Sequence, residues 1–473
     1  MRAKVTVSSK FTGKKMIFGK FRELFFVGIG GAGMSGIAEI LHNLGYKIGG
    51  SDSAPGEVTE HLEKLGIKIF DRHLGANIGQ ANVVIISSAV GEDNPEVIEA
   101  RKKGVPVIKR AEMLGELMRL KYSIGIAGTH GKTTTTSLIG KIMIKAGLDP
   151  TVIVGGVVAG TGTGASSGSG EYLVAEADEY DRSFLSMFPS MAVVTNIEPD
   201  HLDCYDGMDD LENSFLTYMN RVPFYGLIIY SADDPALARL QNRIVRASVS
   251  FGLSNIADYQ ATEANCFEGG SQFEVLKKGK PLGKISLHVP GRHNILNAVA
   301  SVATASELEI PFETIADALL KFRGVERRFE IKSIVHNIMV VDDYAHHPTE
   351  IRATLETARS SYKRRIIAVF QPHLFSRTKR FHEEFAEALH LADITLLTDI
   401  YPAREKPMEG ITSEMIFRDA IQKGYKNIRY VGAKENAIGE ILKDVRAGDM
   451  IITIGAGSIT RLNPEIIKEL KKR

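Results

Sequence analysis

The segment of residues 128–133 has the sequence GTHGKT and lies between an apolar stretch and a segment with helical periodicity. Small residues at the start of a helix expose consecutive backbone N–H groups, and these can surround a chain of negatively charged phosphates. Lys132 supplies a positive charge for the outer phosphates, and the hydroxyl of Thr133 is placed to hold Mg²⁺. The pattern therefore predicts a nucleoside triphosphate site.

This segment departs from the G-x-x-x-x-G-K-[ST] form of a phosphate loop at the first glycine. Ile126 stands at that position, and the glycines stand instead at Gly125 and Gly128. A chance Gly-Lys-Thr at a helix start is the alternative interpretation. The strand-like stretch before the loop, the helix-like segment after it and the glycine pair favour the nucleotide site.

Acidic residues follow two apolar stretches that are predicted to be later strands of the same sheet, Tyr172–Ala175 and Met191–Thr195. The carboxyl ends of parallel strands meet at the edge where the phosphate loop must lie. Glu176 and His201 come shortly after these strands, and their side chains would complete Mg²⁺ coordination around bound phosphates. Acidic groups after strands are also common as solvated helix caps. The remaining acids are expected to be surface or capping groups: Glu179, Asp181 and Asp203.

A second glycine-rich loop lies near the N-terminus, in FFVGIGGAGMSGIA at residues 25–38. Gly28, Gly30 and Gly33 have the G-x-G-x-x-G spacing of a nucleotide-binding turn between a strand and a helix. The basic residues before this run superficially resemble the start of a signal peptide, but a secretory apolar segment has no reason to keep that spacing. We therefore expect residues 1–20 to be a basic, poorly ordered extension and the chain to be cytoplasmic.

The ligand of this second loop has two interpretations. Asp52 lies where a dinucleotide enzyme places the acid that binds its ribose, so a nicotinamide-dependent dehydrogenase is the first. Against it, the triphosphate loop follows about a hundred residues later, and hydride transfer needs no second phosphate site. Two such loops in one chain suggest two phosphorylated ligands brought together. The glycine loop, Ser51, Asp52, Ser87 and Ser88 should then converge at one edge of a sheet.

Length and composition are those of a multidomain enzyme. The 473 residues correspond to about three domains of ~150 residues. The formal net charge of +1 leaves no global field for nucleic acid or an anionic membrane. Cys204 and Cys266 are too few for a disulfide framework or a thiolate metal site, which indicates a reducing compartment. No apolar run reaches the roughly 20 residues needed to cross a bilayer.

The elements that must position these groups alternate between strand-like and helix-like segments, which predicts parallel, doubly wound sheets. We expect an α/β fold of three domains: an N-terminal Rossmann-like domain, a central domain similar to P-loop ATPases with a mostly parallel sheet, and a C-terminal Rossmann-like domain. The predicted division is a basic extension at 1–20 and domains at 21–121, 122–325 and 326–473.

Individual elements can be predicted from the same pattern. Hairpins are expected over Tyr259–Val289, and a Gly/Ser/Thr-rich mobile surface loop over Gly160–Gly170. The expected strands of the outer domains are Leu24–Gly28, Lys47–Gly50, Val83–Ser87 and Val105–Ile108, and then Ile338–Asp342, Ile366–Phe370, Ile394–Thr398, Ile428–Val431 and Met450–Ile454.

Two asparagines stand at the start of the long apolar segment Ile295–Leu308. Asn294 and Asn297 are three residues apart, so they share one face of the predicted helix and both amides can face one ligand. Asn294 can alternatively be the N-cap of that helix. The sequence leaves these two roles open.

Five motifs resemble, in order, those of the Mur ligases, bacterial enzymes that add amino acids to the peptidoglycan precursor. They are GTHGKTT at 128–134, EADE at 176–179, NIEPDH at 196–201, HNILN at 293–297 and GVERRF at 324–329. Three more resemble the branch of the family that adds L-alanine to UDP-N-acetylmuramate: GIGGAGMS at 28–35, DDYAHHPTE at 342–350 and QPHLFSR at 371–377. The similarity covers nearly everything from about residue 21 onward, with small departures at Ala345, Leu374 and Phe375.

The resemblance implies an ATP-dependent ligase with Mg²⁺ as cofactor and with UDP-N-acetylmuramate and L-alanine as substrates. ATP would convert the carboxylate to an acyl phosphate, and the amine of L-alanine would attack it to give an amide, ADP and phosphate. A relative that attaches a whole tripeptide to the same nucleotide is the close alternative, and the dehydrogenase is the alternative from another class. The implied role is in cell wall synthesis, without nucleic acid or membrane partners, as a monomer or weak homodimer.

The resemblance also assigns residues to roles. The predicted catalytic residues are Lys132, Glu176, His201 and Arg328, and the predicted metal ligands are Thr133, Glu176 and His201. The predicted ATP contacts are Gly128, Thr129, His130, Gly131, Lys132, Thr133, Thr134, His293, Asn294, Asn297 and Asp343. The predicted contacts of the uridine nucleotide are Gly28, Gly30, Gly31, Gly33, Met34, Ser35, Ser51, Asp52, His73, Ser87 and Ser88. The basic group expected to bind the amino acid carboxylate is His346, His347, His373, Arg377 and Arg380.

Overall fold

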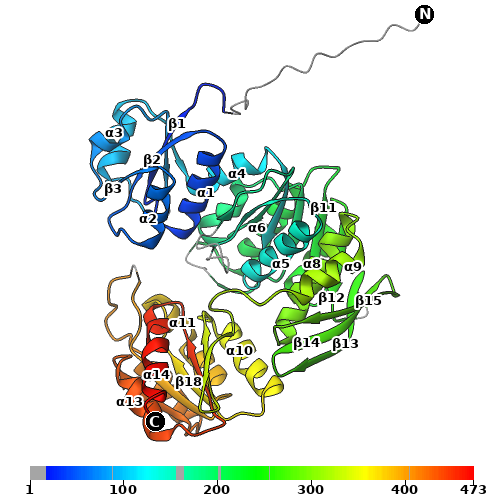
Figure 1. The fold of residues 1–473 in the computed structure, drawn as a ribbon, viewed down its shortest axis with the longest axis vertical. Coiled ribbons are helices and arrows are strands. Elements are labelled where there is room, and N and C mark those ends of the chain that lie inside the picture. The colour runs from blue at the N-terminus through cyan, green and yellow to red at the C-terminus, as the bar shows by residue number, and fades with distance from the viewer. Residues whose placement is uncertain (1–17, 88, 156–164, 201–203, 255, 404) are drawn as a thin grey trace, which may run out of the picture.

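A computed structural model describes residues 18–87, 89–155, 165–200, 204–254, 256–403 and 405–473. Three α/β bodies follow one another along the chain, each built on its own sheet (Figure 1). We call them the first, middle and third domains. The three-layer arrangement of helices around mostly parallel strands confirms the predicted fold class.

The first domain has a parallel five-stranded sheet in the order β3-β2-β1-β4-β5. Its strands are β1 (Glu23–Val27), β2 (Lys47–Ser51), β3 (Lys68–Phe70), β4 (Val83–Ile86) and β5 (Val107–Lys109), and its helices are α1 (Ala32–Asn43), α2 (Glu57–Lys64), η1 (Gly75–Ile78), α3 (Pro95–Lys102) and α4 (Arg110–Met118). The alternation is as predicted, but β3 and α4 are additions that the sequence pattern did not indicate.

Phe18 falls within the predicted extension but contacts the first domain. The ring of Phe18 lies 5.2 Å from that of Tyr46, and the backbone N–H of Phe18 donates to the Tyr46 hydroxyl at 2.9 Å. Residues 1–17 lie outside the described residues.

The middle domain has a ten-stranded sheet in the order β15-β14-β13-β12-β11-β10-β6-β9-β7-β8. The strands are β6 (Tyr122–Ala127), β7 (Thr151–Ile153), β8 (Ala165–Ser166), β9 (Tyr172–Glu176), β10 (Met191–Val194), β11 (Leu227–Ser231), β12 (Ser248–Gly252), β13 (Tyr259–Phe267), β14 (Gly270–Lys277) and β15 (Lys280–Leu287). The helices are α5 (Lys132–Lys145), η2 (Tyr180–Ser186), α6 (Met208–Asn220), α7 (Pro235–Leu240), η3 (Gln241–Arg243), α8 (Arg292–Glu307) and α9 (Phe312–Leu320). The antiparallel pairing of β13, β14 and β15 confirms the predicted hairpins.

The predicted loop at 160–170 is wrong at two of its residues. Ala165 and Ser166 form β8, which pairs antiparallel with β7. Beyond β8, a Cβ on Gly170 would lie 1.9 Å from the carbonyl oxygen of Leu148, so this glycine is needed for close backbone packing. Residues 156–164 lie outside the described residues.

The third domain has a six-stranded sheet in the order β16-β17-β21-β18-β19-β20, parallel except for the edge strand β16. The strands are β16 (Glu330–Val335), β17 (Ile338–Asp343), β18 (Ile366–Phe370), β19 (Ile394–Thr398), β20 (Ile428–Gly432) and β21 (Met450–Ile454). The helices are α10 (Pro348–Ser361), α11 (Phe375–Leu389), α12 (Glu414–Gln422), α13 (Asn436–Asp444), η4 (Ser458–Leu462) and α14 (Asn463–Leu470). All five predicted strands are present.

The cores show how the domains are joined. Buried apolar side chains of the first and middle domains form one continuous cluster, which includes Ile37 in α1 and Phe184 in η2. The third domain has its own two clusters, one on each face of its sheet. No described helix is both long and apolar enough to be a candidate membrane span.

Candidate active site

The phosphate loop joins β6 to α5 at the centre of the middle sheet. Gly128 has φ +135° and Gly131 has φ +84°, both in the region that favours glycine. A Cβ on Gly128 would lie 2.0 Å from the hydroxyl oxygen of Thr195, so the close approach of β10 also requires glycine there. Gly125 is explained in the same way, since its Cβ would lie 2.3 Å from the Tyr218 hydroxyl. Ile126 is fully buried in β6, which explains the departure from the usual glycine pattern.

Lys132 is the first residue of α5 and is held in place by acceptors. Its Nζ donates to the carbonyl oxygen of Gly128 at 2.6 Å and to the carboxylate of Glu179 at 2.7 Å. Burial lowers the pKa of Lys132, but the carboxylates of Glu179 and Asp178 outweigh burial and raise the pKa. The lysine therefore keeps the positive charge that an outer phosphate needs.

Glu179 corrects the expectation that it is a surface or capping group. The residue is 1% exposed and directly contacts the catalytic lysine candidate. Asp181 is partly exposed, as expected, and its carboxylate pairs with Lys109 of the first domain at 2.7 Å. Asp203 and the predicted metal ligand His201 lie outside the described residues.

Glu176 is the last residue of β9, next to the phosphate loop. Burial raises the pKa of its carboxyl group, and the N–H of Gly155, the charge of Lys132 and the hydroxyl of Thr133 oppose that shift. Its Oε1 atom is buried and has no hydrogen-bond partner in the described part of the chain. A buried carboxylate oxygen of this kind, beside a threonine hydroxyl, suits a hard divalent cation.

A cavity of about 380 Å³ opens between the phosphate loop and the third domain. It is lined by many of the predicted ATP contacts: His130, Gly131, Thr133, Thr134, His293, Asn294, Asn297 and Asp343, together with the predicted catalytic residue Arg328. Gly128, Thr129 and Lys132 are in the loop but do not line the cavity. A cleft between two domains, with charged groups from both, is typical of a nucleotide site.

Neither of the two asparagines is the N-cap of α8. Gly291 is the N-cap of α8, and Asn294 lies within the first turn, where its amide donates to the carbonyl oxygen of Pro290 at 2.7 Å. The amide oxygen of Asn297 accepts from the Thr135 hydroxyl at 3.3 Å and would lie 2.5 Å from a Cβ on Gly131. The N-cap alternative for Asn294 is therefore wrong, and Asn297 packs against the phosphate loop.

The third domain supplies charged groups to the opposite wall. The carboxylate of Asp343 accepts from the N–H groups of Phe329 and Ala345, each at 2.8 Å, and burial raises its pKa to about 6. Arg328 donates to the carboxylate of Glu350 at 3.1 Å. Burial and the nearby guanidinium of Arg328 lower the pKa of His293 to about 4, so this imidazole is neutral at pH 7.

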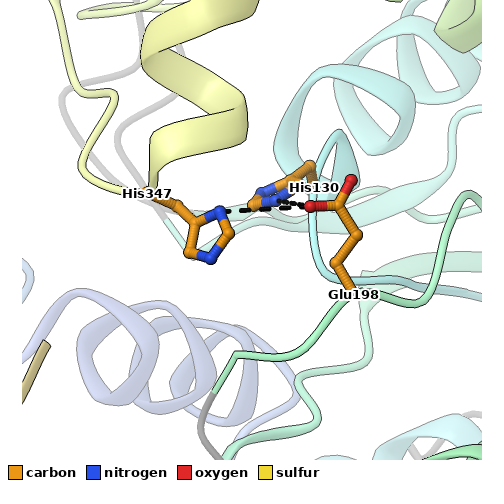
Figure 2. A group of neighbouring side chains, drawn as sticks. All are labelled: His130, Glu198 and His347. Atoms are coloured by element: carbon orange, nitrogen blue, oxygen red, sulfur yellow. Dashed lines mark ion pairs between the residues drawn. The ribbon is translucent and has the colours of Figure 1, made fainter. Parts of the chain in front are cut away.

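His130 lies in the phosphate loop next to the third domain, and Figure 2 shows it beside Glu198, which also lies near His347 of the third domain. Its Nε2 lies 3.4 Å from Glu198 of the middle domain, and its Nδ1 lies 3.4 Å from Glu350 of the third. Glu198 also accepts from the Thr349 hydroxyl at 2.6 Å, and His347 Nδ1 lies 4.0 Å from it. Neither acid was predicted as a site residue.

The trio of His130, Glu198 and His347 also has the composition of a metal site. Burial lowers the pKa of His130, but the nearby carboxylates of Glu198 and Glu350 raise it to about 9. Without a bound metal, the contacts of His130 with Glu198 and Glu350 link the middle and third domains.

The predicted basic group of the third domain is brought together in part. The guanidinium of Arg377 donates to the carboxylate of Asp200 at 3.1 and 3.2 Å, and the pair is buried between the middle and third domains. The rings of His346 and His373 lie 5.9 Å apart, and burial lowers the pKa of His346 to about 3. Arg380 is the exception, because its side chain is exposed and its guanidinium lies over the Phe381 ring.

The first domain gathers the predicted uridine nucleotide contacts at the carboxyl edge of its sheet. The N–H of Gly30 donates to the carboxylate of Asp52 at 2.8 Å, and the Ser51 hydroxyl lies 2.9 Å from His73 Nδ1. Ser87 lies beside Gly28, 3.1 Å from the position of a Cβ there. Gly31 lies in the same loop, and Ser88 lies outside the described residues.

Other residues of this edge differ from the prediction. Met34 and Ser35 are each 1% exposed, and Met34 belongs to the hydrophobic core, so its side chain has no free surface for a ligand. Arg110 was not predicted, yet its guanidinium would lie 2.8 Å from a Cβ on Gly33, which places a positive charge at the glycine loop. Glu96 was not predicted either, and its carboxylate joins Ser51 and His73.

Family comparisons cover most of the chain. The model described as "Mur ligase family, catalytic domain" matches residues 23–122. "Mur ligase middle domain" matches residues 126–305, and "Mur ligase, glutamate ligase domain" matches residues 327–457.

Individual relatives match over nearly their whole length. A UDP-N-acetylmuramate--L-alanine ligase of Geotalea daltonii is 48% identical over 456 residues, which cover 96% of this chain and 100% of the relative. The enzyme of that name from Geotalea uraniireducens is 50% identical over 455 residues, covering 96% and 99%. Among solved structures, UDP-N-acetylmuramate-alanine ligase MurC from Thermotoga maritima has a TM-score of 0.80 at 30% identity and 95% and 99% coverage. A murein peptide ligase from Psychrobacter arcticus has a TM-score of 0.69 at 26% identity, with 96% and 99% coverage.

Proposed function

The chain belongs to the Mur ligase family, and on that premise we propose that it joins the amino group of L-alanine to the carboxylate of UDP-N-acetylmuramate, with ATP as the energy source. It is an ATP-dependent, Mg²⁺-dependent ligase of peptidoglycan precursor synthesis. The observation that carries the choice of substrates is the 48% identity, over 96% of this chain, to a relative named for this reaction.

Lys132 is central to the chemistry that we propose. A carboxylate and an ammonium ion do not condense in water, so the carboxylate must first take the terminal phosphoryl group of ATP to become an acyl phosphate. Negative charge accumulates on the phosphoryl oxygens during that transfer, and a fixed cation stabilises it. Glu179 and the carbonyl of Gly128 fix the ammonium group of Lys132 at the loop before ATP arrives, so little reorganisation is needed.

The described residues fit one Mg²⁺ ion next to this lysine. Glu176 offers a buried Oε1 without a partner, and Thr133 offers its hydroxyl at the start of α5. When bound, Mg²⁺ neutralises phosphate charge and orients the terminal phosphoryl group. We propose His201 for a second ion, and this residue is outside the described part of the chain.

The third domain closes the site from the opposite side. Arg328 and Asp343 line the nucleotide cavity, and we propose that they contact the phosphates and the ribose of ATP respectively. His346, His373 and Arg377 lie together beside the junction with the middle domain, and we propose that they hold the α-carboxylate of L-alanine. Excluding water between the two domains protects the acyl phosphate from hydrolysis.

Two alternatives are less well supported. The murein peptide ligase is similar over 96% of this chain but at 26% identity, well below the relatives named for L-alanine. A nicotinamide-dependent dehydrogenase would use the first glycine loop but would leave the Lys132, Glu179 and Glu176 arrangement without a role.

The test is phosphate release measured with each substrate omitted in turn. We expect release to require ATP, UDP-N-acetylmuramate and an amino acid together, and L-alanine to be preferred to glycine, L-serine and the tripeptide in parallel assays. Turnover that is faster with the tripeptide, or NADH binding detected by fluorescence, would favour the corresponding alternative.

A further inference from the structure

A completely buried carboxylate lies beneath the predicted uridine nucleotide site of the first domain. Glu96 is the second residue of α3 and is 0% exposed. Its Oε2 accepts from the Ser51 hydroxyl at 2.6 Å and lies 3.0 Å from His73 Nδ1, and its Oε1 accepts from the Asn77 amide at 2.7 Å. The carboxylate therefore joins α3 to the end of β2, to the loop after β3 and to η1.

Helix capping does not explain this acid. Asn94 is the N-cap of α3, and its side chain accepts from the N–H of Glu96 at 2.9 Å, while Pro95 occupies the first helical position. The carboxylate of Glu96 is left to face the sheet edge. A buried carboxylate is costly unless its oxygens are hydrogen-bonded, so the three donors around it are a specific arrangement.

The contacts determine which nitrogen of His73 carries a proton. The Ser51 hydroxyl has one hydrogen, and at 2.6 Å from Glu96 that hydrogen is directed to the carboxylate. The serine oxygen and the carboxylate are then both acceptors toward His73 Nδ1, at 2.9 and 3.0 Å. Nδ1 must therefore be the protonated nitrogen, and in the neutral imidazole Nε2 keeps its lone pair.

The other ring nitrogen is available to a ligand. The His73 side chain is 24% exposed, and Nε2 has no hydrogen-bond partner among the residues that the structure describes. A lone pair at this position accepts hydrogen bonds. A diphosphate offers only acceptors, whereas uridine offers donors at the N3–H of the base and at the ribose hydroxyls.

We propose that Glu96 is a positioning residue for the uridine nucleotide, which holds His73 as the Nδ1–H tautomer so that Nε2 accepts a hydrogen bond from uridine. This inference rests on the proposed function, because that function supplies the uridine nucleotide as substrate. Glu96 touches no ligand itself and acts through His73 and Ser51. A lone pair at Nε2 would favour a nucleoside with a hydrogen-bond donor over a free sugar diphosphate.

The first test is made on the wild-type protein. Two-bond ¹H–¹⁵N spectra of protein labelled with ¹⁵N-histidine distinguish the two neutral tautomers, and the His73→Ala variant assigns the signal. We expect the Nδ1–H pattern for His73 at pH 7.5. An Nε2–H tautomer, or an imidazolium with both nitrogens protonated, would overturn the proposal without recourse to any other variant.

The second test separates substrate binding from turnover. Glu96→Leu removes both acceptor oxygens, and Glu96→Gln keeps one of them. We expect the KM for UDP-N-acetylmuramate to rise roughly tenfold in Glu96→Leu, the effect of losing about one hydrogen bond, and to rise less in Glu96→Gln. The kcat and the KM for ATP should stay within about twofold of wild type, because the ATP site is in another domain.

The matched control is Glu99→Gln, on the same helix and with the same change of charge. Glu99 pairs only with Lys103 in the described structure, at 3.6 Å, so we expect wild-type kinetics.

A double-mutant cycle tests whether Glu96 acts through His73. Glu96→Leu should add no further loss of UDP affinity in a His73→Ala background. Additive losses would show that Glu96 acts independently of His73 and would overturn the proposal.

UDP analogues identify the donor. Binding of UDP, 3-methyl-UDP and 2′,3′-dideoxy-UDP to the wild type is compared by calorimetry, and one analogue should bind more weakly by roughly tenfold. Equal binding of all three would refute a hydrogen bond from uridine to Nε2.

The outcomes separate the two hypotheses. A wild type that fails to release phosphate with both substrates contradicts the proposed function. An active wild type, with a KM for UDP-N-acetylmuramate that is unchanged in Glu96→Leu, contradicts only the role of Glu96.

Discussion

The charge on His130 should make the stability of this protein depend on pH in the mildly alkaline range. The imidazole lies between Glu198 of the middle domain and Glu350 of the third, at 3.4 Å from each. Burial lowers its pKa, but the two carboxylates more than compensate and raise it to about 9. Burial raises the pKa of Glu198 and of Glu350, but His130 lowers that of Glu198, and His346, His130 and Arg328 together hold that of Glu350 well below its usual value.

The sign and size of the effect follow from linkage. In the unfolded chain His130 has a pKa of about 6.5, so its contribution to folding is complete below that pH and is lost as the pH rises through 9. The folded and unfolded values differ by about 2.5 units, which sets a limit of about 3.4 kcal/mol. Evaluated between pH 7 and pH 9, the loss is about 2 kcal/mol.

The measurement is a comparison of variants across pH. Glutamine is neutral at every pH, so the His130→Gln variant removes the contribution of the His130 charge to stability and leaves the other titrating groups in place. The three domains need not unfold together, so the quantity compared is the calorimetric transition that includes the middle domain. We expect the difference in free energy of unfolding between the wild type and His130→Gln to fall by about 2 kcal/mol between pH 7 and pH 9. The exposed His288 provides the control variant His288→Gln, which should follow the wild type.

A wild-type curve parallel to that of His130→Gln over this range would refute the reasoning. It would mean that His130 is neutral in the folded protein, and that Glu198 and Glu350 do not stabilise its charge. The trio with His347 would then have to be reconsidered as a metal site, and Zn²⁺ binding to the apo-protein would be the next measurement.

Three further outcomes are expected. Lys132→Ala should lower the rate of ADP formation by about 10²–10³-fold while circular dichroism remains that of a folded protein, and near-normal ADP formation would contradict the role of the lysine. Glu176→Gln should raise the Mg²⁺ concentration needed for half-maximal activity by at least about tenfold, and an unchanged metal titration would remove Glu176 from the site. Gly128→Ala should lower stability by about 1–3 kcal/mol, because its Cβ would lie 2.0 Å from the Thr195 hydroxyl oxygen, and a melting temperature equal to wild type would show that β10 can move away.

The fold could be predicted from the sequence wherever buried strands form unbroken apolar runs. Ile366–Phe370 and Met450–Ile454 lie at the centre of the third sheet, are buried throughout and were predicted to the residue. The edge strand Glu330–Val335 is exposed at three of its six positions and fully buried at only one, so it lacks the apolar pattern that marks a buried strand. The strand Lys68–Phe70 has only three residues, too few for any periodicity to be read.

The candidate site was predicted best where its groups follow one another in the chain. The phosphate loop is continuous, and its backbone geometry follows from local glycine and helix-start signals. The acids that hold it are distant in sequence: Glu179 is 47 residues from Lys132, and the contact of Thr349 with Glu198 spans 151 residues. A carboxylate in a polar segment looks solvated in the sequence, and only the tertiary fold shows that its partner buries it. The same reason applies to Glu96.

Ion pairs and a hydrogen bond cross the junction between the middle and third domains, and this has a consequence for the catalytic cycle. Arg377 pairs with Asp200, His130 with Glu350, and Thr349 donates to Glu198 across the same junction. Separating buried ion pairs exchanges their mutual attraction for hydration, so the net cost of opening is far smaller than for an apolar interface of the same size. We therefore expect the junction to open for product release and to close for chemistry, so that the closed form keeps water away from an acyl phosphate. An apolar core continues from the first domain into the middle domain, so we expect these two domains to separate less readily than the third.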